Sequence, residues 1–326
     1  MSTHKITTKK INFKVFRFNA DKDYLPYYDN FKMVVTSEEV VLDILNRIKW
    51  EHDGSFSYRR SCRHGICGAC AIKVNGRSTL ACKERMDDMI ELFGNELTLE
   101  PLSIKRAVKD MIIDKSDFWE KHDSVYPYLI SDVQEHPEHE HIVTPDEAED
   151  LLEADICIQC GACHYACPVV EINEDFFGPA AFVKAYRFEA DVRDEAHKER
   201  LEELQEPNQG VWDCVKCYEC AEACPKDINP INKIKKLHQM LFKEGVAKSN
   251  VATRHAVGFK HSIMKHGLLD EGGLVLYSEG SSIIKHIPVA LKMFRKGKIV
   301  MPWNMPKSKN IDEIKKLIIS SSTAKF

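Results

Sequence analysis

The chain has 326 residues, a length that allows two domains and a third small unit. Its composition, 44% apolar and 29% charged, is typical of soluble proteins. Because no window approaches about 18 uncharged apolar residues, we expect no membrane-spanning helix. The N-terminal residues MSTHKITTKKINF contain no apolar core, so we predict that the chain carries no secretion signal of its own.

Charge is distributed unevenly along the chain. From Lys243 onward there are 15 Lys and Arg against 6 Asp and Glu, a net charge of +9, whereas the first 242 residues carry −13. A basic C-terminal segment is either a solvated surface or a docking segment for an acidic partner or an anionic membrane face. Binding of nucleic acid is disfavoured because no nucleic-acid motif accompanies the charge.

The first segment, residues 1–104, is predicted to form a β-rich domain. Residues 11–18 (INFKVFRF) and 31–36 (FKMVVT) are short β-branched and aromatic runs, the composition of strands. Within 41–48, apolar residues recur every three or four positions, as on one face of a helix, and 96–102 (ELTLEPL) supplies a closing strand. Strands, one amphipathic helix and a cysteine loop together indicate a β-grasp ferredoxin domain.

The twelve cysteines fall into three groups of four, with none left over. Disulfide frameworks belong mainly to small secreted domains with dispersed cysteines, and this chain has neither feature. Ligation of metal by thiolates is therefore the favoured interpretation. The three groups are Cys62, Cys67, Cys70 and Cys82; Cys157, Cys160, Cys163 and Cys167; and Cys214, Cys217, Cys220 and Cys224.

The first group has the spacing C-x4-C-x2-C with a later cysteine, which is typical of plant-type [2Fe–2S] ligation. Gly65 and Gly68 permit the tight loop that must wrap the cluster, and its amides can point at the cluster sulfurs. Cys82 follows a predicted hairpin whose turn contains Asn75 and Gly76. Zinc is disfavoured, since zinc sites usually pair C-x2-C knuckles across a longer gap.

Residues 105–245 are predicted to form a helical domain, with the pattern turning helical at Ile104 and one long helix over 178–204. Residues 131–150 (SDVQEHPEHEHIVTPDEAED) contain His136, His139 and His141, which together with glutamates form a possible metal site. A Pro-interrupted acidic run between helical segments is more often a solvated linker, and we favour that interpretation.

The second and third cysteine groups, CIQCGACHYACP and CVKCYECAEACP, both match C-x2-C-x2-C-x3-C-P. In two-cluster ferredoxins the fourth cysteine of each run ligates the other run's cluster. Pro168 and Pro225 turn the chain away after each exchanged cysteine. We therefore predict one [4Fe–4S] cluster on Cys157, Cys160, Cys163 and Cys224, and a second on Cys167, Cys214, Cys217 and Cys220.

Three clusters on one chain indicate an electron conductor. The sequence contains no G-x-G-x-x-G motif for a flavin or nicotinamide and no evident nucleophile–base pair, so we assign no catalytic residue to it. His64 and His164 are expected to tune a cluster by polarity or a hydrogen bond rather than relay protons. The chain is expected to carry single electrons while other subunits perform two-electron chemistry.

Residues 246–326 contain no cysteine and combine apolar patches, Gly and Pro breaks and basic residues. The segment is expected to dock on a partner, either as an arm that orders on binding or as a helical extension packed on its own chain. The sequence leaves both alternatives open.

The order of a β-grasp [2Fe–2S] domain and a helical two-cluster domain resembles the iron–sulfur subunits of succinate dehydrogenase and fumarate reductase. The resemblance runs from about Ile11 to Leu237 and includes CRHGICGACAIKVNGRSTLAC, KDMIIDKSDFWEKHDSVYPYL, GPAAFVKAYRF and CPKDINPINKI. It implies an oxidoreductase complex with an FAD-containing flavoprotein, docked near the [2Fe–2S] loop, that interconverts succinate and fumarate. It also implies a membrane quinone as the other redox partner.

The sequence departs from the common members of this family at three places. Cys217 replaces a non-cysteine residue, which predicts a [4Fe–4S] rather than a [3Fe–4S] third cluster. Residues 169–172 (VVEI) and Val215 stand where the common members carry tryptophans and a histidine for the quinone. A quinone site built by this chain is therefore not expected.

The two runs resemble those of heterodisulfide-reductase-type electron carriers. With the C-terminal extension, the chain most resembles the non-classical (type E) subunits of 8-methylmenaquinol:fumarate reductase in epsilonproteobacteria. That resemblance implies a cysteine-rich quinone-linked partner, a membrane surface and a periplasmic address reached with a signal-bearing flavoprotein. The alternatives are a succinate dehydrogenase subunit on the cytoplasmic face, a heterodisulfide-reductase-type electron-transfer module, and a zinc-binding interaction protein.

Overall fold

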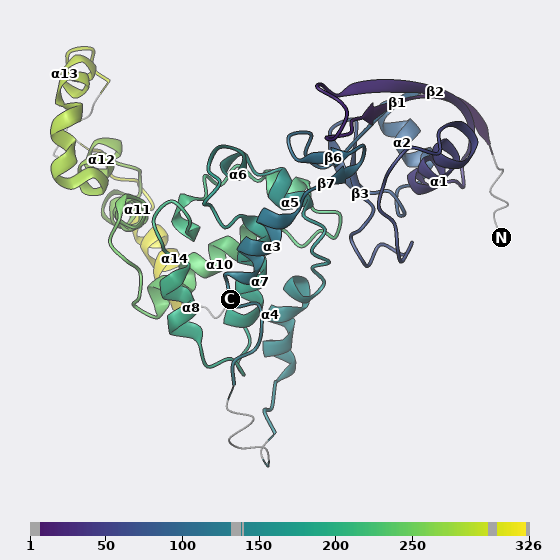
Figure 1. The fold of residues 1–326 in the computed structure, drawn as a ribbon. Coiled ribbons are helices and arrows are strands. Elements are labelled where there is room, and N and C mark those ends of the chain that lie inside the picture. Colours follow the sequence, from purple (N-terminus) through teal and green to yellow (C-terminus); the bar gives the residue numbers. More distant parts are fainter. Residues whose placement is uncertain (1–6, 132–137, 139, 299–304, 324–326) are drawn as a thin grey trace. The chain divides into compact units, whose positions relative to one another are not determined.

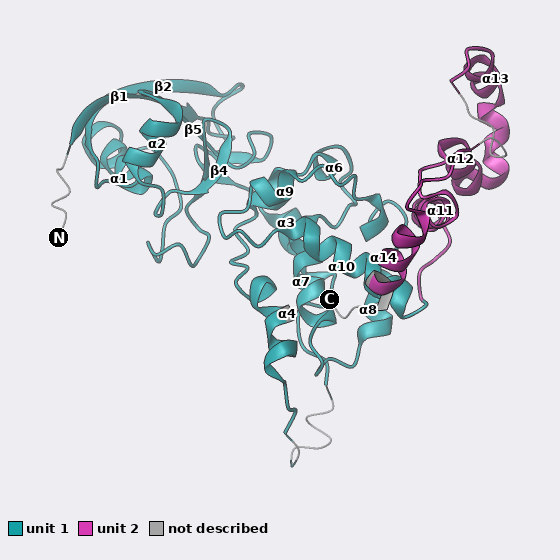
Figure 2. Ribbon diagram, turned by 180° about the vertical axis from the view of Figure 1, so that it is seen from behind, with its two compact units in different colours: residues 1–245 teal, residues 246–326 magenta. Residues whose placement is uncertain are grey.

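The structure, a computed structural model, describes residues 7–131, 138, 140–298 and 305–323. The chain divides into two compact units, Met1–Gly245 and Val246–Phe326, and each is described by itself (Figure 2). The limits 1–104, 105–245 and 246–326 drawn from the sequence stay predictions.

The first unit begins with a five-stranded sheet in the order β2-β1-β5-β3-β4. Strands β1 and β2 lie side by side in Figure 1. The pairing of β1 with β5 is parallel and the other neighbours are antiparallel. This is the predicted β-grasp arrangement, and with the helices that follow it confirms the α+β class. The strands are β1 (Thr8–Arg17), β2 (Tyr27–Thr36), β3 (Ala71–Val74), β4 (Arg77–Leu80) and β5 (Glu96–Glu100).

Two short helices pack with this sheet, α1 (Val41–Arg47) and α2 (Met86–Phe93). The apolar positions recognised in the sequence lie on the inward face of α1, where Ile44 and Leu45 are at most 1% exposed. They share one core with Phe13 of β1. Burial of a Leu or Ile side chain contributes about 1.5–3 kcal/mol, so this face holds the helix on the sheet.

The helical pattern predicted from Ile104 is wrong at its start, because a small hairpin comes first. Strands β6 (Ala107–Lys109) and β7 (Ile112–Ile113) pair around Asp110, whose φ is +47°. The Asp110 carboxylate accepts hydrogen bonds from Arg17 Nε at 3.0 Å and Ser57 N at 2.8 Å. A buried aspartate with these partners ties the hairpin to the β-grasp sheet and overrides the local helical pattern.

The rest of the first unit is helical. Its helices are α3 (Ser116–Asp123), α4 (Pro145–Asp155), α5 (Ala162–Tyr165), α6 (Pro168–Ile172), α7 (Pro179–Glu189), α8 (His197–Glu203), α9 (Glu219–Glu222) and α10 (Pro230–Lys243). Helix α7 lies at the centre, buried along most of its length, and packs against α4, α5 and α10. Both cysteine-run helices, α5 and α9, pack against each other beside it.

The single helix predicted over 178–204 is broken between α7 and α8. Asp191 accepts hydrogen bonds from the Arg193 backbone N at 3.1 Å and side chain at 2.8 Å, while Asp194 accepts from Ala196 N at 3.0 Å. Arg200, 1% exposed, is ion-paired with Asp194 at 2.9 Å. These aspartates hydrogen-bond the backbone in turn conformations and so compete with the helix.

The second unit consists of α11 (Val251–His266), α12 (Glu271–Glu279), α13 (Ile287–Arg295) and α14 (Ile311–Thr323), with a 3₁₀ segment, η4 (Gly280–His286), before α13. Helices α12 and α14 pack on α11. Gly258 of α11 lets α12 approach closely, because a Cβ at position 258 would lie 2.9 Å from the Tyr277 ring. In the described parts of both units, no helix is long and apolar enough to span a bilayer.

Candidate functional site

The first cysteine group is assembled by the β3–β4 hairpin. Asn75 and Gly76 form its turn at φ +47° and +81°, as the Asn-Gly pair predicted. Cys70 directly precedes β3 and Cys82 follows β4, and Ala81 N donates to Cys70 O at 3.1 Å. The hairpin thus returns the fourth cysteine of the group to the loop that carries the other three.

Backbone amides of the loop point at its thiols. Cys62 Sγ accepts from Cys67 N at 3.3 Å and His64 N at 3.4 Å, and Cys82 Sγ accepts from Gly65 N at 3.2 Å. The hydrogen bonds to Cys62, of which the one from the His64 backbone has the largest effect, lower the pKa of the Cys62 thiol to about 6. Amides directed at sulfur stabilise negative charge there, which is what an anionic [2Fe–2S] centre requires.

The second and third runs repeat one backbone conformation. Gln159 and Gly161 of the second run have φ of +52° and +87°, and Lys216 and Tyr218 of the third run have +57° and +71°. A short helix follows in each run, and then the last cysteine and its proline. The alternating positive φ values curl each run so that its first three cysteines face one volume.

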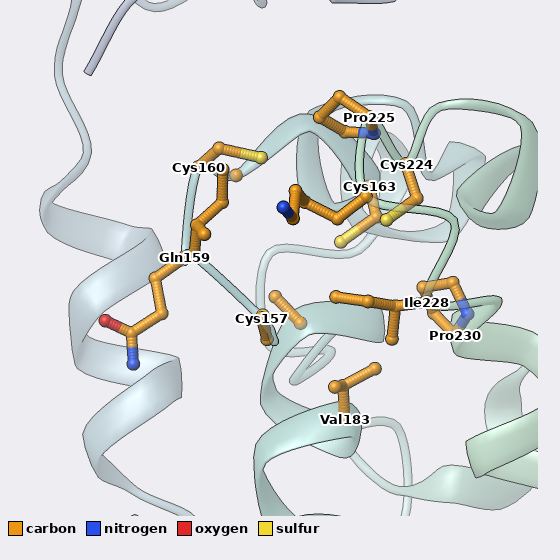
Figure 3. Close-up of a pocket in the computed structure, with 13 residues that line it drawn as sticks. Cys157, Gln159, Cys160, Cys163, Val183, Cys224, Pro225, Ile228 and Pro230 are labelled. Atoms are coloured by element: carbon orange, nitrogen blue, oxygen red, sulfur yellow. The ribbon is translucent and has the colours of Figure 1, made fainter. Parts of the chain in front are cut away.

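The two runs enclose two pockets, and each pocket contains four cysteines. The first, about 370 Å³, is lined by Cys157, Cys160 and Cys163 of the second run and Cys224 of the third (Figure 3). Apolar walls from Val183 of α7 and Ile228 close it.

The second pocket, about 330 Å³, is lined by Cys214, Cys217 and Cys220 of the third run and Cys167 of the second. Phe176, Ile231 and Ile234 supply its apolar walls. The structure therefore brings together the same two sets of cysteines that the sequence predicted, with the fourth cysteine exchanged between runs.

Burial raises the pKa of the Cys160 thiol in the first pocket to about 11 and that of the Cys220 thiol in the second to about 12. The charge of Cys224 further raises the pKa of Cys160, and the charge of Cys167 further raises that of Cys220. Each exchanged cysteine is therefore close enough to act electrostatically on the cysteines of the other run. Four such thiols ionise together only around a strong positive charge, which iron supplies. The donor set fits an iron–sulfur centre.

The described His, Cys, Asp and Glu side chains form no group of three or more arranged to hold a single metal ion. The cysteines of the two runs instead line two separate pockets, four in each. In the alternative histidine site, His136 and His139 lie outside the described residues.

The [2Fe–2S] loop touches the second run at Gly68. A Cβ on Gly68 would lie 2.9 Å from both Cα and Cβ of Cys160 and from the carbonyl oxygen of Ile158, and the φ of Gly68 is +69°. Only glycine fits this approach without displacement of the neighbouring backbone. The loop and the first pocket are therefore in direct van der Waals contact.

Lys115, which the sequence did not single out, lies at the same junction. Its Nζ donates to the carbonyl oxygens of Cys160 at 2.9 Å and Gln159 at 3.3 Å. Burial lowers the pKa of Lys115, and the charges of Cys160 and Cys163 oppose that effect. A lysine in a mixed polar segment gives no sequence signal, because its partners lie 44 and 45 residues further along the chain.

The two histidines of the cysteine loops differ in their surroundings. His164 is 1% exposed, and its Nε2 lies 3.2 Å from Asp117, which also pairs with Arg106 at 3.1 Å. His164 lines neither pocket. His64 is exposed. The expected tuning roles stay predictions, and the ring of His164 is held by Asp117.

Comparison with known families agrees with this architecture. Residues 12–120 match a 2Fe-2S iron-sulfur cluster binding domain, and residues 153–228 match a 4Fe-4S dicluster domain. The fold and these matches define an iron–sulfur protein in which a [2Fe–2S] domain precedes a two-cluster domain.

Curated relatives identify the family. The chain is 35% identical over 231 residues to succinate dehydrogenase [ubiquinone] iron-sulfur subunit 3, mitochondrial, of Arabidopsis thaliana, covering 70% of this chain and 74% of that relative. It is 34% identical over 235 residues to the fumarate reductase iron-sulfur subunit of Haemophilus influenzae, covering 69% and 90%. The chain belongs to the succinate dehydrogenase/fumarate reductase iron–sulfur subunit family, whose members are the electron-transfer subunits of these oxidoreductases.

Solved structures share the fold. A chain of the Mycobacterium smegmatis Sdh1 complex in the apo form superposes with a TM-score of 0.64 at 24% identity, over 74% of this chain and 99% of that one. A hypothetical protein from Helicobacter pylori superposes with a TM-score of 0.52 at 22% identity, over 78% of this chain and 43% of that one.

Proposed function

We propose that the twelve cysteines hold three iron–sulfur clusters, in a [2Fe–2S] domain at 1–104 and a two-cluster domain at 105–245. Support comes from the pockets, because each gathers four cysteines and no other cysteine lines it. The chemistry that these clusters supply when bound is transfer of single electrons. The zinc interpretation has no comparable support.

The ligand sets are four cysteines each: Cys62, Cys67, Cys70 and Cys82 for [2Fe–2S]; Cys157, Cys160, Cys163 and Cys224 for the first [4Fe–4S]; and Cys167, Cys214, Cys217 and Cys220 for the second. Cys217 lines its pocket together with the other three cysteines of the set. This observation supports a complete second [4Fe–4S] site in preference to [3Fe–4S].

Each of the two terminal cysteine sets contains one exposed cysteine, whereas the middle set contains none. Cys67 and Ile66 of the [2Fe–2S] loop are exposed, as are Cys217 and Val215 of the third run, whereas Cys160 is buried. We propose that a flavoprotein carrying FAD docks at the [2Fe–2S] end and a cysteine-rich, quinone-linked subunit docks at the other. Electrons enter the chain at the third run and leave it at the [2Fe–2S] loop.

The complex that we propose is a quinol:fumarate reductase of the 8-methylmenaquinol type, peripheral on the periplasmic side of the cell membrane and active in anaerobic respiration. Cys217, residues 169–172 and Val215 support this subtype, since they depart from the common quinone-binding pattern. A succinate dehydrogenase on the cytoplasmic face is the second candidate, because several relatives carry that name.

Purification of the complex and assay with fumarate and with succinate test this proposal. We expect fumarate reduction with a low-potential quinol to be faster than succinate oxidation with the corresponding quinone. Succinate oxidation as the dominant activity would favour the second candidate. Iron analysis of the chain is expected to give about ten iron atoms per chain, against about nine for a [3Fe–4S] third centre, and zinc at the cysteines would refute the cluster proposal altogether.

A further inference from the structure

One stretch of the C-terminal unit, residues 281–298, leaves nearly all its side chains in solvent; we refer to it as the apolar–basic segment. All nine residues of α13 are exposed. Of its large apolar side chains, only Ile283 is half-buried, and the other six are between 41% and 69% exposed, namely Ile284, Ile287, Val289, Leu291, Met293 and Phe294. By contrast, α12 buries Leu274 to 7%.

The apolar and basic side chains of α13 occupy separate arcs. At about 100° per residue, the arc from Val289 through Met293 and Phe294 to Leu291 covers roughly 200° of the helix and contains only apolar residues. The remaining arc carries the basic side chains. The whole segment contains five basic residues and no Asp or Glu, namely Lys285, Lys292, Arg295, Lys296 and Lys298.

We propose that the apolar–basic segment binds an anionic lipid surface, with α13 lying in the plane of the interface. An exposed apolar arc bordered by Lys and Arg is the pattern of helices that bury their apolar face at the headgroup boundary. The lysine side chains extend outward to the lipid phosphates. Positive charge without any acidic residue complements a surface that is negative throughout.

An acidic protein groove fits these observations less well than a lipid surface. Helices that dock in grooves present a narrow stripe at i, i+3, i+4 and i+7, and the apolar arc of α13 is about twice as wide as such a stripe. At 1.5 Å per residue, the nine residues of α13 extend about 13 Å, less than half of a hydrocarbon core of about 30 Å. The helix therefore lies on the membrane rather than crossing it.

This inference deepens the membrane part of the proposed function but is tested without any redox measurement. The full chain, purified with its clusters, is sedimented with vesicles of phosphatidylcholine, with or without phosphatidylglycerol. We expect binding only to the phosphatidylglycerol vesicles, and weaker binding as salt rises. Iron content and cluster spectra, recorded for every protein, report separately on the electron-transfer proposal.

Three double variants locate the contact. Leu291→Glu with Phe294→Glu is expected to abolish vesicle binding. Lys292→Gln with Lys296→Gln is expected to weaken it by about 25-fold, at roughly fivefold for each cation removed. The matched control, Lys315→Gln with Lys316→Gln, removes the same charge from α14 and is expected to bind as the native chain does. All six positions are exposed or half-buried, so circular dichroism should show unchanged helix content.

The proposal is overturned if the native chain does not sediment with phosphatidylglycerol vesicles. It also fails if the Leu291 and Phe294 variant binds normally, or if the α14 control loses as much affinity as the α13 variant. A fourth result would replace the lipid proposal with a protein ligand. If the native chain does not bind vesicles and the α13 variants no longer assemble with the partner subunits, the segment binds an acidic protein surface instead.

Discussion

Substitution of Gly68 by alanine tests the contact between the [2Fe–2S] loop and the second cysteine run. The added Cβ meets backbone and Cβ atoms at 2.9 Å, and these are not the ends of flexible side chains. One of the two segments must therefore move. The φ of +69° adds a second, independent cost for any residue with a Cβ.

The two costs are separable in magnitude. A left-handed conformation costs a non-glycine residue about 1–2 kcal/mol, and overpacking of a filled contact costs about 1–3 kcal/mol. Gly68→Ala should then lower the free energy of unfolding by about 2–5 kcal/mol. Gly65→Ala is a matched control, since its φ is +68° and its nearest neighbours are 3.9 Å away. It should lose only the first 1–2 kcal/mol.

Anaerobic urea unfolding of the iron-loaded chain measures the difference, followed through cluster absorbance and circular dichroism. Gly68→Ala should also slow reduction of the [2Fe–2S] centre by electrons supplied at the third run, whereas Gly65→Ala should not. Equal losses of stability in the two variants, or unchanged electron transfer in Gly68→Ala, would show that the loop and the run are not in the contact described.

Three further predictions concern single side chains. Cys217→Ser should convert or destabilise the third cluster while the [2Fe–2S] electron paramagnetic resonance signal persists; loss of all signals would argue against independent sites. Lys115→Met should lower the midpoint potential of the first [4Fe–4S] centre by about 40 mV, because a nearby positive charge favours the reduced form by about 1 kcal/mol. Lys115→Arg keeps the charge and should leave the midpoint potential unchanged. Burial lowers the pKa of His238 to about 4, so the unfolded chain binds more protons between about pH 4 and 6.5. Stability should fall by about 2 kcal/mol from pH 7 to pH 5 in urea unfolding, and His238→Gln should flatten that profile; an unchanged slope would assign the effect to other groups.

The sequence predicted what short-range spacing determines and missed what distant contacts impose. Strand alternation, the Asn75–Gly76 turn and the cysteine spacings each encode local geometry, and the confirmed fold class follows from them. The hairpin at 107–113 was missed because Asp110 is held by Arg17, which lies 93 residues away. Lys115 was missed for the same reason. The cluster types stay predictions, since spacing constrains the ligands and not the inorganic core.

The exchange of Cys167 and Cys224 between the two pockets has a consequence for assembly. When each pocket is filled, the centre joins cysteines on both sides of the segment between the runs, which includes the central helix α7. The first pocket joins Cys163 to Cys224 and the second joins Cys167 to Cys214, which closes loops of about 61 and 47 residues. In the chain-entropy treatment of cross-links, closing a loop of either length contributes about 4 kcal/mol, as a disulfide of that span does. Loading one pocket closes its loop and so brings the cysteines of the other pocket into place. We therefore expect the two pockets to gain and lose iron cooperatively, so that loading of one pocket favours loading of the other.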